Sequence, residues 1–324
     1  MSNIFDFNGA RAADNPIENV QLNQDPLVTE LVLGQPQATF IPGTRLFPSI
    51  NVQNWVFEYT TLSNEHLGRY ETERSMRAPI LHGDWSAQTT PAKLRRYSFR
   101  ILKDIDELTN AHPTLRIRER SAALARRIVM MNLERNKRDL AVLAASYPGG
   151  HDVTLGGGSE WDSAGGDSRT NVRTATAALS TATGLMPSDF SVFLSLSSFE
   201  AALSDPVFLA ARGNYTTDIA DEVILQKYWG TGPVFVGNPV EEIAGIVTPM
   251  YADVAILFYD GSATGMSTDF GDLTWSANFT WNRGVASSPW FDPVHTSWSF
   301  PWTEYSHPTI LTPNSGYIIR NTAA

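Results

Sequence analysis

Acidic side chains and tryptophans gather in the second half of the chain, where they could act on a glycan. Aromatic rings stack on sugars, and a pair of Asp or Glu side chains can cleave a glycosidic bond. The residues of these types are Asp292, Glu304, Glu241 and Glu242, with Trp275, Trp281, Trp290, Trp298 and Trp302. Tryptophan at strand spacing is more often a packing residue or an interface anchor. A glycan-active or glycan-binding protein is therefore an alternative, and packing is the favoured interpretation.

Other catalytic and cofactor motifs have no anchor in this sequence. The patterns G-x-S-x-G, G-x-x-x-x-G-K-[ST], G-x-G-x-x-G and H-E-x-x-H do not occur. The chain has no cysteine, which excludes disulfides, thiolate metal sites and a cysteine nucleophile. Its histidines, at positions 66, 82, 112, 151, 295 and 307, are dispersed, so only the fold could collect them into a metal site. We predict no catalysis, no cofactor and no metal.

Length and composition describe a chain that can bury a core of its own. It has 324 residues, of which 42% are hydrophobic, and a net charge of −10. Its first residues lack the basic segment and apolar run of a signal peptide. Apolar runs fall far short of the roughly 20 residues that cross a bilayer. We therefore expect synthesis in the cytoplasm and no membrane contact.

Charge is distributed unevenly along the chain. Residues 1–150 contain 18 Lys and Arg against 16 Asp and Glu, whereas residues 151–324 contain 6 against 18. A basic stripe at residues 93–138 has 13 basic and 5 acidic side chains. Because acidic residues interleave with the arginines, ion pairs within or between subunits explain the stripe better than nucleic-acid binding does.

The first half of the chain predicts extended elements that cannot fold alone. Residues 1–47 show no sustained period and have little apolar surface. Alternating patterns typical of strands occur within residues 52–77 and at residues 94–102, and they flank a long polar stretch. A hairpin of this length with few apolar residues cannot bury itself. It needs a neighbouring molecule.

A long helix is the strongest local signal. It is predicted at about residues 114–146, with Thr114 as the N-cap and Pro148-Gly149-Gly150 as the stop. Thirty-odd residues at 1.5 Å per residue make a rod on the order of 45 Å. Such a rod is too long for an average compact domain and indicates a structural strut.

Beyond the glycine clusters at residues 149–150, 156–158 and 165–166, the pattern is α+β. The predicted helices lie at residues 169–183, 198–204 and 218–229, and the predicted strands at residues 190–196, 233–237, 254–259 and 316–319. Between the last two strands, residues 272–302 alternate aromatic and polar side chains.

This order of parts resembles the major capsid proteins of tailed bacteriophages with the Hong Kong 97-type fold. The stretches Arg74-Ser75-Met76-Arg77-Ala78-Pro79, Tyr97-Ser98-Phe99-Arg100 and residues 105–111 resemble the E-loop return and the approach to the spine helix. Residues 178–195, 198–209 and 217–237 resemble the A-domain in the expected order. The motifs are loose one by one, and their order is the specific part. The resemblance covers roughly residues 45–260 and the last strand.

The resemblance implies a fold and a function. The expected parts are an N-arm (1–47), an E-loop (48–98), a P-domain with the spine helix (99–160), an A-domain (161–250) and a β-rich return (251–324). Hexamers and pentamers of this chain would form an icosahedral head around double-stranded DNA, which is contacted non-specifically. Scaffolding, portal and decoration proteins would be further partners, in the virion after assembly in the bacterial cytoplasm. An encapsulin-like cargo compartment, which shares the fold, is a second alternative.

The resemblance also places contacts between subunits on the E-loop and spine helix. The candidate contact residues are Arg69, Arg74, Arg77, Trp85, Arg95, Arg96, Arg126, Arg127 and Glu134. In the founding member of the family an E-loop lysine forms a covalent bond with an asparagine of another subunit. Here no lysine lies between residues 50 and 92, so we expect noncovalent contacts instead.

Overall fold

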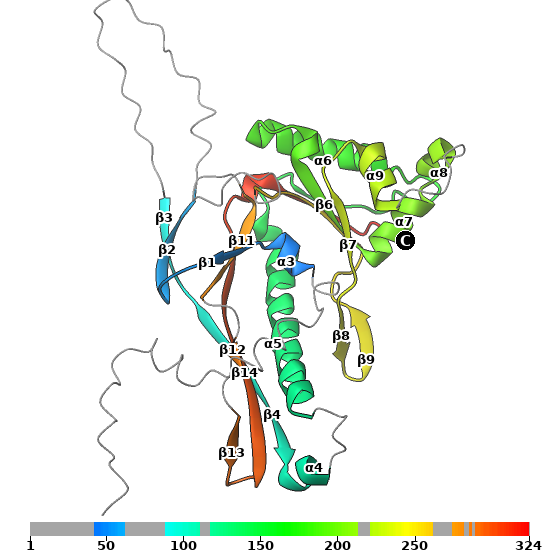
Figure 1. The fold of residues 1–324 in the computed structure, drawn as a ribbon. Coiled ribbons are helices and arrows are strands. Elements are labelled where there is room, and N and C mark those ends of the chain that lie inside the picture. Colours follow the sequence, from blue (N-terminus) through cyan, green and yellow to red (C-terminus); the bar gives the residue numbers. More distant parts are fainter. Residues whose placement is uncertain are drawn as a thin grey trace, which may run out of the picture. The chain divides into compact units, whose positions relative to one another are not determined.

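The computed structural model describes residues 42–61, 88–110, 117–212, 221–261, 274–281, 285–286 and 289–323. The chain divides into two units. The larger contains residues 37–94, 133–281 and 307–324, and the smaller contains residues 1–36, 95–132 and 282–306. Helices and sheets are mixed in the described residues (Figure 1), which confirms the predicted α+β class. The predicted boundaries of the N-arm, E-loop, P-domain and A-domain stay predictions.

A five-stranded sheet organises the larger unit. Its strands, in the order β5-β15-β10-β6-β7, are β5 (Asp152–Thr154), β15 (Gly316–Arg320), β10 (Val254–Tyr259), β6 (Phe190–Ser195) and β7 (Val234–Gly237). β10 pairs antiparallel with β6 and β15, whereas the outer pairs β6–β7 and β15–β5 are parallel. Every residue of β6 and β10 is buried, which explains why both are runs without a charged side chain.

Four helices lie beside this sheet (Figure 1), and each buries apolar residues in the same core. They are α6 (Ser168–Thr183), α7 (Leu196–Ser204), α8 (Pro206–Arg212) and α9 (Asp221–Trp229). α6 begins where the Asp167 carboxylate accepts a hydrogen bond from the amide of Thr170, and it ends at Gly184, whose φ is 76°. The predicted helices and strands of this region are confirmed, except that residues 218–220 of the third predicted helix lie outside the described residues. α8 and the 3-10 turns η5 (Pro187–Asp189) and η6 (Pro313–Ser315) were not predicted.

The predicted long helix is also present. α5 (Ile117–Val142) has 26 residues and spans about 39 Å. A 3-10 turn, η4 (Ala144–Ser146), follows it. The predicted N-cap, Thr114, lies outside the described residues. No helix in the described part of the chain is both long and apolar enough to cross a membrane.

The predicted hairpin has a different return strand. β2 (Val56–Thr61) pairs antiparallel with β3 (Gln88–Lys93), and Thr61 lies opposite Gln88. Residues 94–102 were predicted to close this hairpin, but β4 (Arg95–Asp104) pairs with β14 (Ser297–Ile310) instead. The short helix α3 (Gly43–Leu46) precedes β1 (Ser49–Asn51), which runs parallel to β11 (Ser276–Thr280).

The smaller unit is built around residues 297–306 of β14. These residues pair antiparallel with β4, with β12 (Val285–Ala286) and with β13 (Trp290–Asp292). β4 leads into α4 (Ile105–Asn110). Residues Ala122, Ala125 and Val129 of α5 are buried. β14 was missed as one strand because it contains Pro301 and Pro308, and proline normally argues against a strand interior.

A separate two-stranded sheet lies between β7 and β10 in the sequence and was not predicted. β8 (Val240–Ile243) pairs antiparallel with β9 (Ile246–Pro249), and Figure 1 shows this hairpin as a ribbon apart from the five-stranded sheet. Its turn residues, Ala244 and Gly245, have φ of 53° and 85°. Positive φ at both central residues is what a two-residue turn of type I′ requires.

Candidate functional site

The tryptophans of the second half mainly build the core. Trp275 and Trp302 have no exposed surface, and Trp281 is buried. The Trp275 ring stacks on Tyr147 at a centroid distance of 5.7 Å. Trp298 is half-buried and Trp290 is exposed. A fully buried ring cannot stack on a sugar, so the packing interpretation is favoured over the glycan alternative.

The carboxylates considered for glycan chemistry have other partners. The Asp292 carboxylate lies 3.0 Å from His295 Nδ1 and 3.4 Å from Arg100 NH1. The hydrogen bond from His295 lowers the pKa of Asp292, whereas a general acid requires a raised one. Glu304 accepts a hydrogen bond from the Trp302 indole. These contacts favour structural roles.

The described histidines also have structural surroundings. His151 is buried, and its Nδ1 lies 3.0 Å from the carbonyl oxygen of Gly316. Among the residues that the structure describes, no three His, Asp or Glu side chains gather as a metal site would require. His66, His82 and His112 lie outside those residues.

Four of the predicted contact residues lie on accessible elements. Arg95 and Arg96 are exposed at the start of β4, and Arg127 is exposed on α5. Arg126 is half-buried, with its guanidinium 5.5 Å from the centre of the Trp302 ring. The pKa of Arg126 is lowered, because the effect of burial is larger than the opposing effect of the Glu304 charge. Arg69, Arg74, Arg77 and Trp85 lie outside the described residues, and the intersubunit role of the whole set stays a prediction.

Glu134 does not fit its predicted role as a surface contact, because its side chain is completely buried within one chain. Its Oε1 accepts a hydrogen bond from the amide of Gly43 at 2.9 Å and another from the Tyr251 hydroxyl at 3.2 Å. A Cβ atom at position 43 would collide with the Glu134 carboxylate, which explains the glycine there. The carboxylate therefore holds the start of α3 against α5.

The surroundings of Glu134 disfavour its charge. Burial raises the pKa of Glu134 above its usual value of 4.5, while the nearby Lys137 and the two hydrogen bonds act in the opposite direction. Lys137 is itself only 3% exposed. Two ionisable groups are thus buried in the larger unit, where the charge of each stabilises the opposite charge of the other.

The β8–β9 hairpin is the accessible feature that sequence reasoning missed. Val240, Ile243, Ile246 and Val247 are 43%, 56%, 66% and 64% exposed. Strand alternation places Val240 and Val247 on one face of this two-stranded sheet and Ile243 and Ile246 on the other, so both faces expose aliphatic side chains. The signal available in the sequence was the run Ile243-Ala244-Gly245-Ile246, a turn flanked by aliphatic residues.

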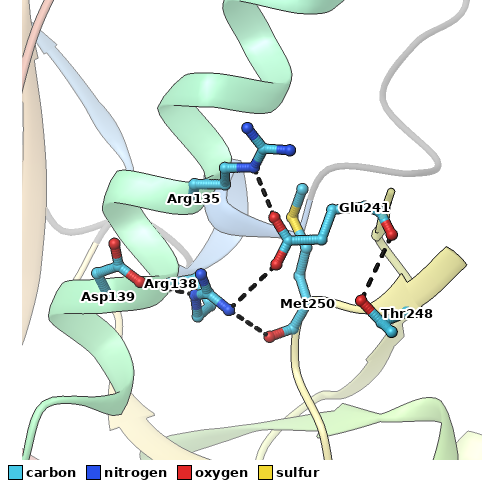
Figure 2. Close-up of polar contacts among 6 residues, drawn as sticks. All are labelled: Arg135, Arg138, Asp139, Glu241, Thr248 and Met250. Carbon is cyan, nitrogen blue, oxygen red and sulfur yellow. Dashed lines mark hydrogen bonds and ion pairs between the residues drawn. The ribbon is translucent and has the colours of Figure 1, made fainter. Parts of the chain in front are cut away.

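An ion-pair cluster ties this hairpin to α5 (Figure 2). The Glu241 carboxylate of β8 accepts a hydrogen bond from Arg135 Nε at 2.6 Å and lies 3.5 Å from Arg138 NH1. Arg138 NH1 also donates to the carbonyl oxygen of Met250 at 3.2 Å, just beyond β9. The Glu241 side chain is 7% exposed, so it contributes little to the molecular surface. The cluster fixes one face of the hairpin and leaves the other free.

Replacing Glu241 with glutamine should loosen the hairpin. The substitution keeps the shape but removes the charge that two arginines share, a loss of about 1 kcal/mol for partly exposed pairs. Hydrogen exchange of the β8 and β9 amides should become about fivefold faster. Glu242→Gln is the control, because the Glu242 side chain is the next carboxylate along the chain, is exposed and lies outside this cluster. Equal exchange in both variants would contradict the anchoring role.

The fold is that of the major capsid proteins of tailed phages, the Hong Kong 97-type fold, as the resemblance predicted. A phage-related protein from Bordetella bronchiseptica RB50 matches with a TM-score of 0.75 at 20% identity, over 93% of this chain and 98% of that one. The capsid structure of cyanophage P-SCSP1u matches with a TM-score of 0.55 at 11% identity, over 86% of both chains. A virus-like particle from Pyrococcus furiosus matches with a TM-score of 0.51 at 10% identity, over 94% of this chain and 100% of that one. No protein-family model and no curated protein matches the sequence.

Proposed function

We propose that this chain is the major capsid protein of a tailed bacteriophage. Copies of it assemble, without catalysis, into hexamers and pentamers of an icosahedral head that encloses double-stranded DNA. The observation that carries the proposal is the fold, which matches a cyanophage capsid structure over 86% of both chains. Because fold alone does not define function, the surface of the molecule must support the proposal as well.

Two described features offer surfaces to neighbouring molecules. The first is the β8–β9 hairpin, a two-stranded sheet that exposes aliphatic side chains. The second is the exposed face of α5, which carries both arginines and aliphatic residues. The β2–β3 pair instead packs within the chain, because Phe57 and Tyr59 contact Phe279 at ring-centroid distances of 4.7 and 5.5 Å. Identical subunits around a shell would cover the two exposed surfaces in every copy.

The proposal extends to partners and location. Scaffolding, portal and decoration proteins would associate with the shell, DNA would be contacted non-specifically, and the virion would be the final location after assembly in the host cytoplasm. The predicted contact residues Arg69, Arg74, Arg77, Trp85, Arg95, Arg96, Arg126 and Arg127 belong to this proposal. Glu134 is omitted because its side chain is buried.

A cargo compartment is the second candidate function. A virus-like particle from Pyrococcus furiosus, which matches over 94% of this chain at a TM-score of 0.51, supports a shell that is not a phage head. The contents of particles from the natural source distinguish the two functions. Packaged DNA indicates a phage head, whereas an enclosed protein without DNA indicates a compartment.

Electron microscopy of the purified protein tests both candidates together. Shells, tubes or capsomer rings are the expected result, with or without a co-expressed scaffold. Small discrete particles that never assemble at high concentration would contradict both a capsid and a compartment function. They would favour the glycan-binding alternative, which sugar binding monitored through tryptophan fluorescence would then examine.

Residues 62–87 are expected to be needed for shell closure. Because Thr61 lies directly opposite Gln88, a two-residue Asn-Gly turn can replace them and leave β2 and β3 paired. The shortened protein should remain folded, with a melting temperature close to that of the full chain, but should form no closed shells. Normal shells in electron micrographs of the shortened protein would count against a role of this segment in assembly.

A further inference from the structure

One face of the β8–β9 hairpin is left exposed by its own chain. We infer that it packs on an exposed stripe of α5 in a second copy of this chain. The inference rests on the proposed function and deepens it, because it names which two surfaces of the shell subunit meet. It is based on the exposure of the residues on the two surfaces, on the face of the strand or helix where they lie, and on their charge.

Strand alternation divides the hairpin into two faces. Glu241 faces its own α5, where Arg135 and Arg138 hold it. Val240 and Glu242 therefore point to the opposite face, together with Val247, which is paired with Glu242. Val240 and Val247 are 43% and 64% exposed, and Glu242 is exposed. This face, called here the free face, is an apolar strip with one negative charge.

The turn of the hairpin supports a contact role. Ala244 occupies a positive-φ position where asparagine, aspartate or glycine would be less strained. Ile243 and Ile246 flank the turn and are 56% and 66% exposed. An exposed turn made only of apolar residues is unusual unless another surface covers it. By strand alternation both isoleucines lie on the same face as Glu241, so the tip adds exposed apolar surface next to the free face.

The N-terminal part of α5 offers a surface of matching chemistry. Arg120, Leu124, Arg127 and Ile128 follow one helical stripe and are all exposed, with Leu124 at 50% and Ile128 at 37%. The buried residues of α5, Ala122, Ala125 and Val129, lie on the opposite side of the helix. The stripe therefore combines two aliphatic side chains with two positive charges.

Charge favours a contact between the hairpin and the α5 stripe over contacts between two hairpins or between two stripes. A contact between two hairpins would bring Glu242 against Glu242, and a contact between two stripes would bring arginines together, which costs free energy in both cases. Hairpin on stripe instead places Glu242 near Arg120 or Arg127 and the valines on Leu124 and Ile128. Two different surfaces of identical subunits form a head-to-tail contact, which can close into rings.

Cysteine cross-linking tests the contact directly, because the chain contains no cysteine of its own. One chain has Val247→Cys, and a second chain with an affinity tag has Leu124→Cys. The two chains are co-expressed, assembled and oxidised. A disulfide forms only if the Cβ atoms approach to about 4 Å. We expect a disulfide-linked heterodimer on non-reducing gels in assembled particles.

In the control, the first chain carries Met186→Cys and keeps Val247, and the second chain, with Leu124→Cys, is unchanged. Met186 is suitable because it is 69% exposed and distant in sequence from the hairpin. This pair should give at least tenfold less heterodimer. Particles without a Val247–Leu124 heterodimer, or with Val247–Val247 dimers instead, would overturn the inference and leave the proposed function standing. A chain that forms no particles overturns the proposed function, and the inference falls with it.

Charge reversal provides a second measurement. Glu242→Arg should lower the yield of particles at least tenfold without changing the melting temperature of the unassembled chain, because Glu242 is exposed there. Combining it with Arg127→Glu should restore at least half of the yield. An equal defect in the single and double variants would contradict a direct pairing of hairpin and stripe.

Discussion

Replacing Glu134 with alanine is expected to lower the free energy of unfolding by about 3–5 kcal/mol. The substitution removes the acceptor of the Gly43 amide and the Tyr251 hydroxyl, both buried in the larger unit. It also removes a carboxylate that interacts electrostatically with Lys137, whose charge then remains in a buried site. Urea denaturation of the wild type and the variant, followed by circular dichroism, measures the difference.

The matched control for this prediction is Asp139→Ala on the same helix. The Asp139 side chain is 65% exposed and its ion pair with Arg138 lies at the surface. Surface pairs contribute about 0–1 kcal/mol, so the control should change stability little. If both variants lost the same stability, the burial of Glu134 would have no energetic consequence and the structural role given to it would be wrong.

Glu134 also predicts a pH dependence. Because its pKa is raised in the folded state above 4.5, the folded chain binds the proton more readily than the unfolded chain does. The contribution of Glu134 to stability therefore grows as the pH falls through its raised pKa, and it levels off below 4.5, where both states are protonated. The Gln side chain of the Glu134→Gln variant does not titrate. The melting temperature of the wild type, relative to that of the variant, should therefore rise as the pH is lowered. A constant difference between pH 7 and 4 would contradict the raised pKa.

Trp275→Ala is expected to cost a comparable amount, about 3–5 kcal/mol. Trp275 is fully buried, and its ring contacts Phe47, Tyr147 and Phe258 at centroid distances of 5.8, 5.7 and 5.8 Å. Gly316 approaches the same ring so closely that no Cβ atom fits there. The indole thus joins four segments that are distant in sequence, and its removal leaves a large cavity among them.

Trp290→Ala provides the comparison, since Trp290 is 44% exposed on β13. Its truncation should change the stability of the chain by about 1 kcal/mol or less. Thermal unfolding of the two variants measures the contrast. Similar losses in both variants would contradict the division of these tryptophans into core and surface residues.

The sequence by itself determined the elements whose signals are local. β10 and β6 are short runs without charged residues, and α6 has both a capping aspartate and a terminal glycine. The long helix followed from apolar spacing over many turns. Such signals depend only on neighbouring residues, so they can be interpreted without knowledge of the fold.

Pairings between distant segments could not be predicted in this way. β3 has the sequence Gln-Thr-Thr-Pro-Ala-Lys, which carries no strand period, and its pairing with β2 provides the hydrogen bonds that its own sequence does not indicate. β14 contains two prolines and was missed as a single strand for the same reason. The β8–β9 hairpin turns at Ala244-Gly245, which is not among the strong hairpin signals.

The candidate site shows the same division between local and distant information. The sequence marked α5 as a mixed-charge strut whose side chains would meet other subunits, which stays a prediction, and the structure places Arg127 at the surface. Only the tertiary structure decided that Glu134, seven residues later, is buried. Its partners Gly43 and Tyr251 are 91 and 117 residues away in the chain. A charge pattern reports which side chains are polar, whereas burial depends on which distant segments fold against them.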